Sequence, residues 1–331
     1  MTSVLLDIQN LETHLRLEEG IAKVVDRVSF SIKRGETLAL VGESGCGKTM
    51  TAYSILRLVP SPPGKIVGGK ILFEGEDIVN ATEKRMREIR GNRIAMIFQE
   101  PLTSLNPVFK VGAQISEVLQ IHRKMKKKGA LEIAVELLKD VGIPSPEQRI
   151  NDYPHQMSGG MRQRVMIAMA LACDPDLLIA DEPTTALDVT VQSQIMDLLN
   201  SIKKKHNMSL LLITHDLGVV AETAKNVAVM YAGRIMEYAD VNSLFESPQN
   251  PYTIGLLASL PHFGKERLKP IKGMVPMIHD LPAGCKFNTR CEYAFKKCFE
   301  SEPDLVDLGT NNGCRHLVRC WKAKQQLTAN S

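Results

Sequence analysis

Hydrophobic and polar positions follow two different periods along roughly the first 240 residues of the chain. Short, continuous apolar runs occur at 37–41 (TLALV), 177–180 (LLIA), 210–214 (LLLIT) and 227–231 (VAVMY). Runs of this length predict strands that are buried on both faces, as in a parallel sheet. Between these runs, apolar residues recur at helical spacing, as in 161–172 and 191–202. The pattern predicts an α/β fold with a parallel core sheet.

Other stretches depart from this pattern and predict an additional β layer, a helical subdomain and a small C-terminal domain. The segments LLDIQNLETHLRL, VVDRVSFSI and GGKILFEGEDI alternate between apolar and polar residues, which predicts an antiparallel β layer beside the core. Residues from about 102 to 172 are mostly helical in pattern and separate the core strands, so we expect an inserted helical subdomain. After about residue 250 proline and glycine become frequent. We place a boundary near 265, between a large domain over 1–264 and a small cysteine-rich domain over 265–331.

Charge and hydropathy exclude some classes of function. The net charge of +4 is too small to indicate a nucleic-acid partner. The N-terminal sequence MTSVLLDIQN has neither a basic segment nor a long apolar one, so we expect no secretory signal. No apolar run approaches the roughly 20 residues that cross a bilayer. Any role at a membrane is therefore expected to depend on a partner.

The sequence GESGCGKT at 42–49 fits the phosphate-binding pattern G-x-x-x-x-G-K-S/T. It follows the apolar run 37–41 and precedes a helical stretch, which is the context that the motif requires. Glycines let the backbone curl so that successive N–H groups point at phosphate oxygens. We expect Lys48 to reach the β- and γ-phosphates and Thr49 to ligate Mg²⁺. The candidate nucleotide-binding residues here are Gly42, Ser44, Gly45, Cys46, Gly47, Lys48, Thr49 and Met50.

Polar residues follow three further apolar runs, at the point where each run ends. Asp181 and Glu182 follow LLIA, Gln99 follows IAMIF, and His215 follows LLLIT. Ligands of α/β sheets bind at the carboxyl ends of the strands, which makes these side chains candidates for a site. An acidic residue there can activate the water that attacks a γ-phosphate. We predict Glu182, His215 and Gln99 as catalytic residues, and Thr49, Gln99 and Asp181 as the residues around Mg²⁺.

A second anion-binding feature is predicted at 158–164, in the sequence SGGMRQR. The Ser158 hydroxyl and the amides of Gly159 and Gly160 offer neutral donors at the positive end of a predicted helix. The chain already has a phosphate loop more than a hundred residues upstream. A second anion site therefore requires a second nucleotide or a shared one.

The order of these motifs resembles the ATP-binding subunits of ATP-binding cassette (ABC) transporters. Phosphate loop, glutamine, SGG helix, LLIADEP, TTALD and histidine follow one another within about residues 4–260. In that family two cassettes meet head to tail, and the phosphate loop of one and the SGG helix of the other hold the same ATP. The resemblance implies an ABC nucleotide-binding domain over 1–264 that hydrolyses ATP with Mg²⁺. It also implies that Ser158, Gly159, Gly160 and Asp188 lie at the seam between two cassettes.

Two positions depart from the family pattern. The signature reads MSGGM where the family has a sequence close to LSGGQ, so Met161 replaces a polar side chain while the main-chain donors remain. Family members commonly stack adenine on an aromatic residue in the N-terminal β layer, but the stretch THLRLEEGIAK contains none. His14 and Arg16 are the alternatives for this contact.

Three segments resemble the dipeptide, oligopeptide and nickel importers within this family: FQEPLTSLNPVFKVGAQI, YPHQMSGGMRQR and NPYTIGLLASLP. The first begins around Gln99, where the family docks a short helix of the membrane subunit. The resemblance implies a second ATPase subunit, usually a distinct one, with a homodimer of this chain as the alternative. It also implies two permease subunits, an external peptide-binding protein and a place on the cytoplasmic face of the membrane. We expect a D-type subunit of a dipeptide or oligopeptide importer. A nickel importer subunit and a soluble ABC ATPase acting on nucleic acid or ribosomes are the alternatives.

Five of the seven cysteines lie within residues 285–331. Without a secretory signal, this density favours a metal centre over disulfides. The C-x₂₋₄-C pairs of zinc sites are absent, whereas the wider spacing is compatible with an iron–sulfur cluster held by four thiolates. Zinc and free thiols remain alternatives.

The peptide-importer subfamily often carries a C-terminal element associated with a 4Fe–4S cluster. The segments GCKFNTRC, KKC and HLVRCW resemble that element. The resemblance implies Cys285, Cys291, Cys298 and Cys320 as ligands, with Cys314 as the alternative fourth ligand.

Overall fold

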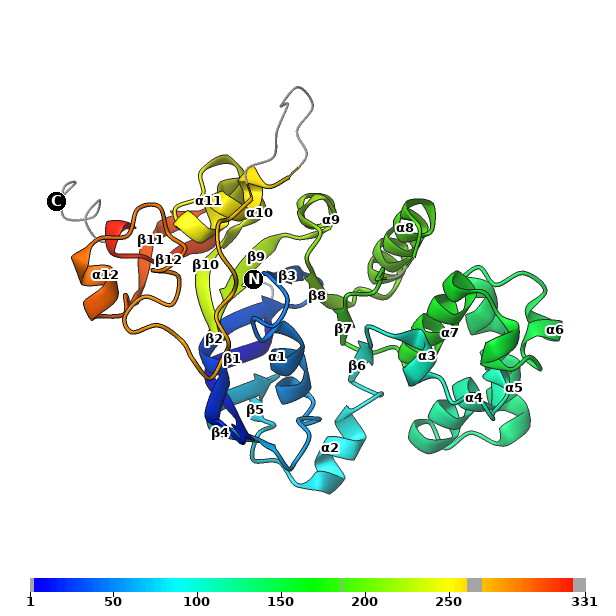
Figure 1. Ribbon diagram of the computed structural model, residues 1–331. Coiled ribbons are helices and arrows are strands. Elements are labelled where there is room, and N and C mark those ends of the chain that lie inside the picture. The colour runs from blue at the N-terminus through cyan, green and yellow to red at the C-terminus, as the bar shows by residue number, and fades with distance from the viewer. Residues whose placement is uncertain (1–2, 186, 261–269, 324–331) are drawn as a thin grey trace. The chain divides into compact units, whose positions relative to one another are not determined.

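The computed structural model describes residues 3–185, 187–260 and 270–323 (Figure 1). The chain forms two compact units. One unit, which we call the helical unit, comprises residues 1–3, 33–36 and 80–213. The other, the phosphate-loop unit, comprises residues 4–32, 37–79 and 214–331. The boundary predicted near residue 265 lies outside the described residues, and the division into 1–264 and 265–331 remains a prediction.

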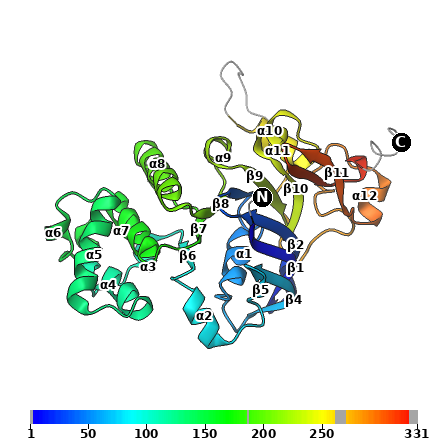
Figure 2. The ribbon, with the colours of Figure 1, turned by 180° about the vertical axis from the view of Figure 1, so that it is seen from behind.

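Two sheets form the framework of the phosphate-loop unit. The first has the strand order β2-β1-β4-β5 (Figure 2). In the second, the strands of this unit follow the order β11-β12-β10-β9-β3. The elements are β1 (Val4–Leu17), β2 (Gly20–Lys33), β3 (Thr37–Val41), α1 (Lys48–Ile55), β4 (Gly64–Phe73), β5 (Glu76–Asp77), α9 (Leu217–Thr223), β9 (Asn226–Tyr231), β10 (Arg234–Asp240), α10 (Val241–Glu246), α11 (Pro251–Ala258), α12 (Lys296–Glu300), β11 (Leu305–Asn311) and β12 (Cys314–Arg319).

The strand directions in this unit match the sequence patterns. Strands β1 and β4 pair antiparallel, as their alternation predicts, with Leu6 opposite Phe73. Strands β3 and β9 pair parallel, and every residue of both is buried, as their continuous apolar runs predict. The cysteine-rich tail joins this sheet, because β12 pairs antiparallel with β10 through Glu237 and Val318.

Helices dominate the helical unit. Its elements are α2 (Glu83–Ile89), β6 (Ile94–Ile97), α3 (Pro101–Ser104), α4 (Val111–His122), α5 (Lys127–Asp140), α6 (Pro146–Arg149), a 3₁₀ turn (Pro154–Gln156), α7 (Gly159–Leu171), β7 (Leu177–Asp181), α8 (Val189–His206) and β8 (Ser209–Thr214). Strands β6, β7 and β8 are parallel and buried along their length, with Ile94 opposite Leu177 and Leu177 opposite Ser209. Helices α4, α5 and α7 pack on one another, which confirms the predicted helical subdomain.

The ends of α8 show why the local sequence forms a helix. Asp188 caps the first turn by accepting a hydrogen bond from the Val191 amide at 2.9 Å, and Asn207 ends the helix in a left-handed conformation. Lysines and a histidine in the last turn complement the negative end of the helix dipole. Within the residues that the structure describes, no helix is both long enough and apolar enough to cross a membrane.

Candidate functional site

The phosphate loop runs from the end of β3 to the start of α1, and glycine is required at two of its positions. Gly42 has φ +153°, and a Cβ placed on it would lie 2.1 Å from the carbonyl oxygen of Met230. Gly47 has φ +102°, and a Cβ there would lie 2.2 Å from the carbonyl oxygen of Val24. Side chains are excluded at both positions by backbone conformation and by space. The loop can therefore curl tightly against β2 and β9, as its motif predicts.

Charged and polar groups of this loop sit at the first turn of α1. Lys48 is buried, and its Nζ donates to the carbonyl oxygens of Gly42 at 2.7 Å and Glu43 at 3.0 Å. Thr49 and Met50 follow it half-buried, whereas Ser44 and Gly45 are exposed on the loop. Lys48 thus lies inside the curve of the loop, where a phosphate chain would be bound.

Cys46 fills space within the same loop. Its side chain is fully buried, and a Cβ on Gly42 would lie 2.8 Å from its Sγ. Burial raises the pKa of the Cys46 thiol, although the neighbouring Lys48 acts in the opposite direction. The thiol is therefore protonated at neutral pH and serves as a packing residue.

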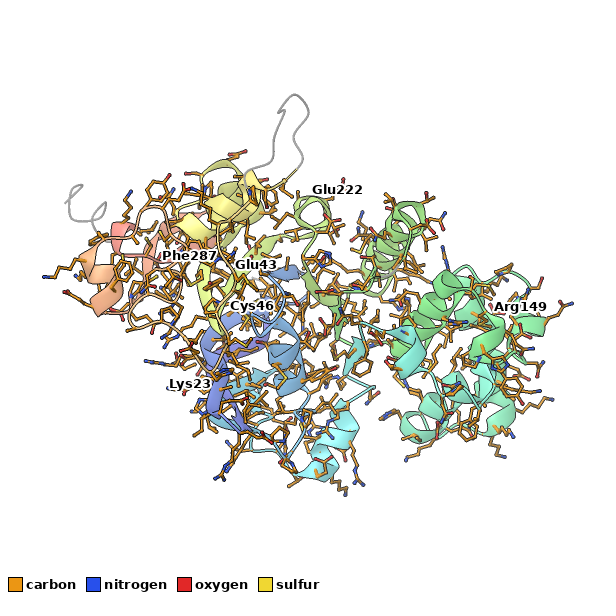
Figure 3. The ribbon with its side chains drawn as sticks, in the orientation of Figure 1. Lys23, Glu43, Cys46, Arg149, Glu222 and Phe287 are labelled. Carbon is orange, nitrogen blue, oxygen red and sulfur yellow. The ribbon has the colours of Figure 1, made fainter. Side chains whose placement is uncertain are left out.

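Sequence patterns did not identify two residues that hold this loop from outside. The Glu43 amide donates to the hydroxyl of Tyr252 on α11 at 3.0 Å, and the Glu43 carboxylate accepts hydrogen bonds from Arg290 of the tail. Figure 3 labels Glu43, Cys46 and Phe287 in this part of the unit. Tyr252 lies in NPYTIG, a segment recognised by its resemblance and not by its chemistry. Arg290 is more than two hundred residues from the loop in sequence and had no such signal.

In the helical unit, a carboxylate and an amide meet at the ends of adjacent parallel strands. Asp181 ends β7 and is buried, and Glu182 follows it with φ +46°. The Gln99 side-chain amide donates to the Glu182 carboxylate at 3.0 Å, and the Thr185 hydroxyl donates to the same oxygen at 3.0 Å. The structure thus brings Gln99 and Glu182 together. Thr185 is an additional partner, three residues along the turn, which lies in the TTALD motif but was not among the predicted site residues.

The SGG helix and the TTALD turn lie side by side in the helical unit. Ser158 caps α7 by accepting a hydrogen bond from the Met161 amide at 3.3 Å. A Cβ on Gly159 would lie 3.7 Å from Leu187, and one on Gly160 would lie 3.0 Å from Val191. A side chain at Gly159 would make only an ordinary contact, whereas one at Gly160 would be tight, so Gly160 lets the start of α7 approach the start of α8, where Asp188 is the cap.

The remaining predicted residues belong to the phosphate-loop unit. His215 is exposed after β8, and the next residue, Asp216, caps α9. His14 lies on β1 with its Nε2 3.8 Å from the Glu12 carboxylate, and Arg16 lies near the end of the same strand. The adenine contact assigned to His14 or Arg16 remains a prediction.

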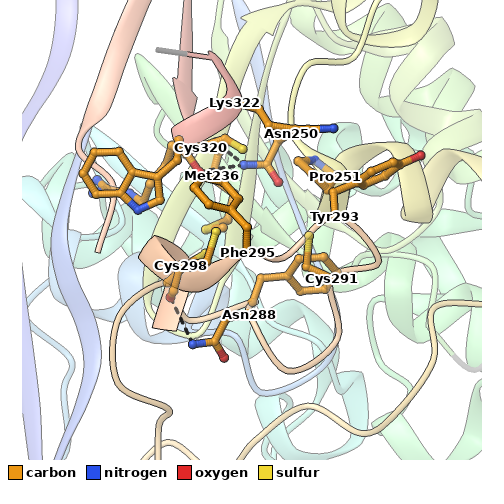
Figure 4. A pocket seen from close by; sticks show the side chains of 14 residues that line it. Met236, Asn250, Pro251, Asn288, Cys291, Tyr293, Phe295, Cys298, Cys320 and Lys322 are labelled. Carbon is orange, nitrogen blue, oxygen red and sulfur yellow. Dashed lines mark hydrogen bonds between the residues drawn. The ribbon is translucent and has the colours of Figure 1, made fainter. Parts of the chain in front are cut away.

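Four tail cysteines line a single pocket in the phosphate-loop unit. These are Cys285, Cys291, Cys298 and Cys320. Figure 4 shows three of them, Cys291, Cys298 and Cys320, on the wall of the pocket. The backbone amide of Cys285 and the side-chain amide of Asn288 both donate to the Cys298 carbonyl, at 2.8 and 3.1 Å, and so close the loop between these cysteines. Cys314 instead lies on β12, where its Sγ is 3.4 Å from the Arg315 carbonyl oxygen.

The cysteines of this pocket match the ligands of an iron–sulfur cluster in number and in kind, because four of them are among the residues that line it. Burial raises the pKa of Cys285 to about 12 and also raises the pKa of Cys291 and Cys320, so these thiols are protonated at neutral pH. The cysteine side chains of the pocket are therefore not placed as ligands around a common metal centre. Among the described residues, no group of three or more His, Cys, Asp or Glu side chains is arranged to hold a metal ion.

Comparison with known families gives two matches along the chain. Residues 25–185 match the ABC transporter family, and this range contains the phosphate loop, Gln99, the SGG helix and Glu182. Residues 236–298 match the C-terminal region of oligopeptide/dipeptide transporters, and this range contains Tyr252 and Arg290.

Curated relatives are similar over nearly the whole chain. The oligopeptide transport ATP-binding protein AppD of Bacillus subtilis is 52% identical over 98% of this chain and 98% of its own length. OppD of the same organism is 51% identical over 96% of this chain and 88% of its own length. The dipeptide transport ATP-binding protein DppD of Haemophilus influenzae is 50% identical over 92% of this chain and 93% of its own length.

Solved structures share the fold. The dimeric ATP-binding cassette MJ0796, in a post-hydrolysis state with ADP and phosphate, matches with a TM-score of 0.64 and 26% identity over 71% of this chain and 98% of that one. CbiO1 of Clostridium perfringens, part of an ABC transporter complex, matches with a TM-score of 0.61 and 28% identity over 74% of this chain and 91% of that one. The predicted α/β fold with a helical subdomain is confirmed.

Proposed function

The chain belongs to the family of ATP-binding proteins of oligopeptide and dipeptide ABC transporters, and on this premise we propose that it is the D-type ATPase subunit of a peptide importer. It binds and hydrolyses ATP, and it energises import through a membrane transporter. The observation that carries this conclusion is the identity of about half of all residues to such proteins over almost their full length. The curled phosphate loop supports it independently.

The residue roles are proposed one by one. Lys48 and Thr49 bind phosphate and Mg²⁺, and Asp181 supports the metal. Glu182 is the general base, because a carboxylate next to a γ-phosphate can orient and activate water. Its hydrogen bond from Gln99 at 3.0 Å holds the carboxylate in one orientation and supports a paired role for the two residues.

Shared nucleotide binding is proposed for the SGG helix and Asp188. Ser158 and the glycines that follow it are exposed or half-buried at the start of α7, where backbone N–H groups and the helix dipole favour an anion. A second cassette, related to this chain or identical to it, would present its ATP there. Hydrolysis would then require the two cassettes to close.

We propose that an exposed apolar tip of the loop between α3 and α4, formed by Val108 and Phe109, contacts a permease. Val108 is 71% exposed and Phe109 is 55% exposed. The buried Gln114 holds this tip, since its side-chain amide donates to the carbonyls of Asn106 and Phe109 at 2.9 Å and its oxygen accepts from the Asn106 amide at 2.9 Å. A rigid apolar tip of this kind is suited to a helix of a membrane subunit. It would place this chain at the cytoplasmic face of the membrane.

The test is reconstitution of the chain with its permease pair, its partner ATPase and its binding protein in vesicles. We expect ATP-dependent uptake of dipeptides or oligopeptides, with ATP hydrolysis stimulated by loaded binding protein. Uptake of nickel without peptide would transfer the assignment to the alternative substrate. Purification of the chain with ribosomes or nucleic acid, and without membrane subunits, would contradict the transporter role.

We further propose that Cys285, Cys291, Cys298 and Cys320 hold a 4Fe–4S cluster. Support comes from the subfamily-like cysteine pattern and from the pocket that these four residues share. Cys320 is favoured over Cys314 because Cys320 lines this pocket. The protons on the half-buried thiols of Cys285, Cys291 and Cys320 would leave as iron binds, with a rearrangement that brings the sulfurs to ligand positions.

We expect anaerobically purified chain to contain about four irons per chain, as a 4Fe–4S centre requires, and to absorb broadly near 400 nm. Cys320→Ser should remove both signals, whereas Cys314→Ser should keep them. Stoichiometric zinc, or an anaerobic preparation without iron and without the absorbance, would overturn the cluster proposal. The ATPase assignment would be unaffected by that result.

A further inference from the structure

The second residue of the phosphate loop is a carboxylate held by an arginine of the tail. Arg290 donates two hydrogen bonds to Glu43, from Nη1 to Oε2 at 2.6 Å and from Nη2 to Oε1 at 2.9 Å. The Arg290 side chain is only 4% exposed, and that of Glu43 is 28% exposed. A bidentate pair of this geometry, whose guanidinium is shielded from water, is stronger and more directional than a surface ion pair.

Arg290 is itself fixed from several sides. Its Nε donates to the Lys272 carbonyl at 3.1 Å, so all three guanidinium nitrogens are engaged. The guanidinium lies 5.8 Å from the centre of the Tyr231 ring and 5.9 Å from that of Phe287. A lysine could not reproduce this fork or its packing. The tail therefore presents a preorganised cation to the phosphate loop.

The same loop residue is also held through its backbone. The Glu43 amide donates to the Tyr252 hydroxyl, and Tyr252 packs against Phe287 with ring centres 5.2 Å apart. Phe287 and Arg290 lie on one short stretch of the tail, between Cys285 and Cys291. Main chain and side chain of Glu43 are thus both fixed, the first by Tyr252 of α11 and the second by Arg290 of the tail.

The negative charge of Glu43 would be unfavourable next to bound ATP without the ion pair to Arg290. A triphosphate carries several negative charges, and the loop that binds it depends on N–H groups and Lys48. An uncompensated carboxylate in the same loop would repel phosphate and would also compete for Lys48. Neutralised by Arg290, Glu43 can contribute its backbone to the loop without that repulsion.

We infer that Arg290 is a positioning residue for ATP binding, which fixes Glu43 and cancels its charge beside the triphosphate. The inference rests on the proposed function, since it concerns the nucleotide at that loop. It assigns a role in nucleotide binding to the cysteine-rich tail. Arg290 acts on ATP through Glu43 and is not a catalytic residue.

The experiment is a double-mutant cycle on the full chain, with the dissociation constant of MgATP measured by calorimetry at low salt. Arg290→Gln should weaken MgATP binding about tenfold or more, because it leaves the half-buried carboxylate of Glu43 unpaired beside the phosphates. Glu43→Gln alone should tighten binding, since Arg290 then remains as an uncompensated cation. The double variant Glu43→Gln/Arg290→Gln should return toward the wild-type affinity. Arg290→Lys should recover only part of the loss.

The matched control is Arg315→Gln, which removes an exposed tail arginine bound to Asp307 at 2.6 Å. It should leave MgATP affinity unchanged, and thermal melting should show that all variants are folded. If Arg290 serves only to hold the tail together, the second substitution at Glu43 will not restore binding, and the inference fails. Equal affinity of Arg290→Gln and wild type also overturns it. Failure of the wild-type chain to bind MgATP would instead reject the proposed function.

Discussion

Glu182 is the residue on which hydrolysis is expected to depend. Its backbone has φ +46°, an uncommon conformation for a side chain of this size, and its amide donates to the Ile213 carbonyl at 2.8 Å. Gln99 and Thr185 both donate to one carboxylate oxygen. Backbone and side chain are therefore both fixed, as expected for a group that must orient a water molecule.

We predict that Glu182→Gln keeps MgATP affinity and lowers the rate of ATP hydrolysis by about 10²- to 10⁴-fold, the usual contribution of a general base. The amide keeps the shape of the side chain but cannot accept a proton. ATP hydrolysis by the assembled transporter and MgATP binding by the chain are the two measurements. Glu222→Gln, on the exposed surface of α9, is the control and should hydrolyse at the wild-type rate. Rapid turnover by Glu182→Gln would assign the base to another residue.

At the scale of elements, Asp176 ties together the starting ends of three parallel strands. Its amide donates to the Arg93 carbonyl before β6, and its carbonyl accepts from the Ser209 amide at the start of β8, both at 2.9 Å. Its carboxylate accepts hydrogen bonds from Arg93 and from Arg34, the latter at 2.9 Å. Burial alone would raise the pKa of Asp176, but the two guanidinium groups lower it overall.

Because the pKa of Asp176 is lower in the folded state than in the unfolded chain, ionisation of this residue stabilises the fold above about pH 4. That stabilisation is lost as the pH falls through the folded-state pKa. We predict that Asp176→Asn lowers the free energy of unfolding by about 1–3 kcal/mol at pH 7, and by much less near pH 2. Urea unfolding at several pH values measures this difference. Asp197→Asn, exposed on α8, is the control, and a loss at Asp176 that does not change with pH would contradict the prediction.

At the scale of the whole molecule, the tail completes the core of the phosphate-loop unit. Phe287 is 4% exposed and packs against Tyr231 and Tyr252, with ring centres 5.3 and 5.2 Å apart. These rings join the buried side chains of β9, α9 and α11 in one cluster. Strand β12 adds backbone pairing to β10. The tail is thus part of the support of the nucleotide loop as well as a carrier of cysteines.

We predict that Phe287→Ala destabilises the chain by about 3–5 kcal/mol, since it removes a buried ring and leaves a cavity. MgATP affinity should fall with it, because Tyr252 and Arg290 lose a packing partner. Thermal melting and calorimetry measure the two effects. The control, Phe299→Ala, removes the same type of ring from a tail position that is 51% exposed. It should change neither the melting temperature nor the MgATP affinity. Equal melting temperatures for the two variants would show that the tail does not support this core.

Local features could be predicted from the sequence because they depend on residues close along the chain. The apolar runs determined the parallel strands, Gly42 and Gly47 determined the curled loop, and Ser158 marked the start of helix α7. Each outcome depends on backbone conformation, or on hydrogen bonds that span a few residues. The order of the motifs then indicated the family.

Contacts between distant segments were decided only by the tertiary structure. Nothing in the sequence pairs Arg290 with Glu43, Phe287 with Tyr252, or Asp176 with Arg34. That Cys285, Cys291, Cys298 and Cys320 line one pocket is likewise visible only in the fold, although the family resemblance had already implied these four as ligands. Such pairs form where packing of the whole core brings chain segments together, and that packing reflects shape and burial summed over many residues. A local pattern specifies which groups can interact, whereas the fold selects which of them do.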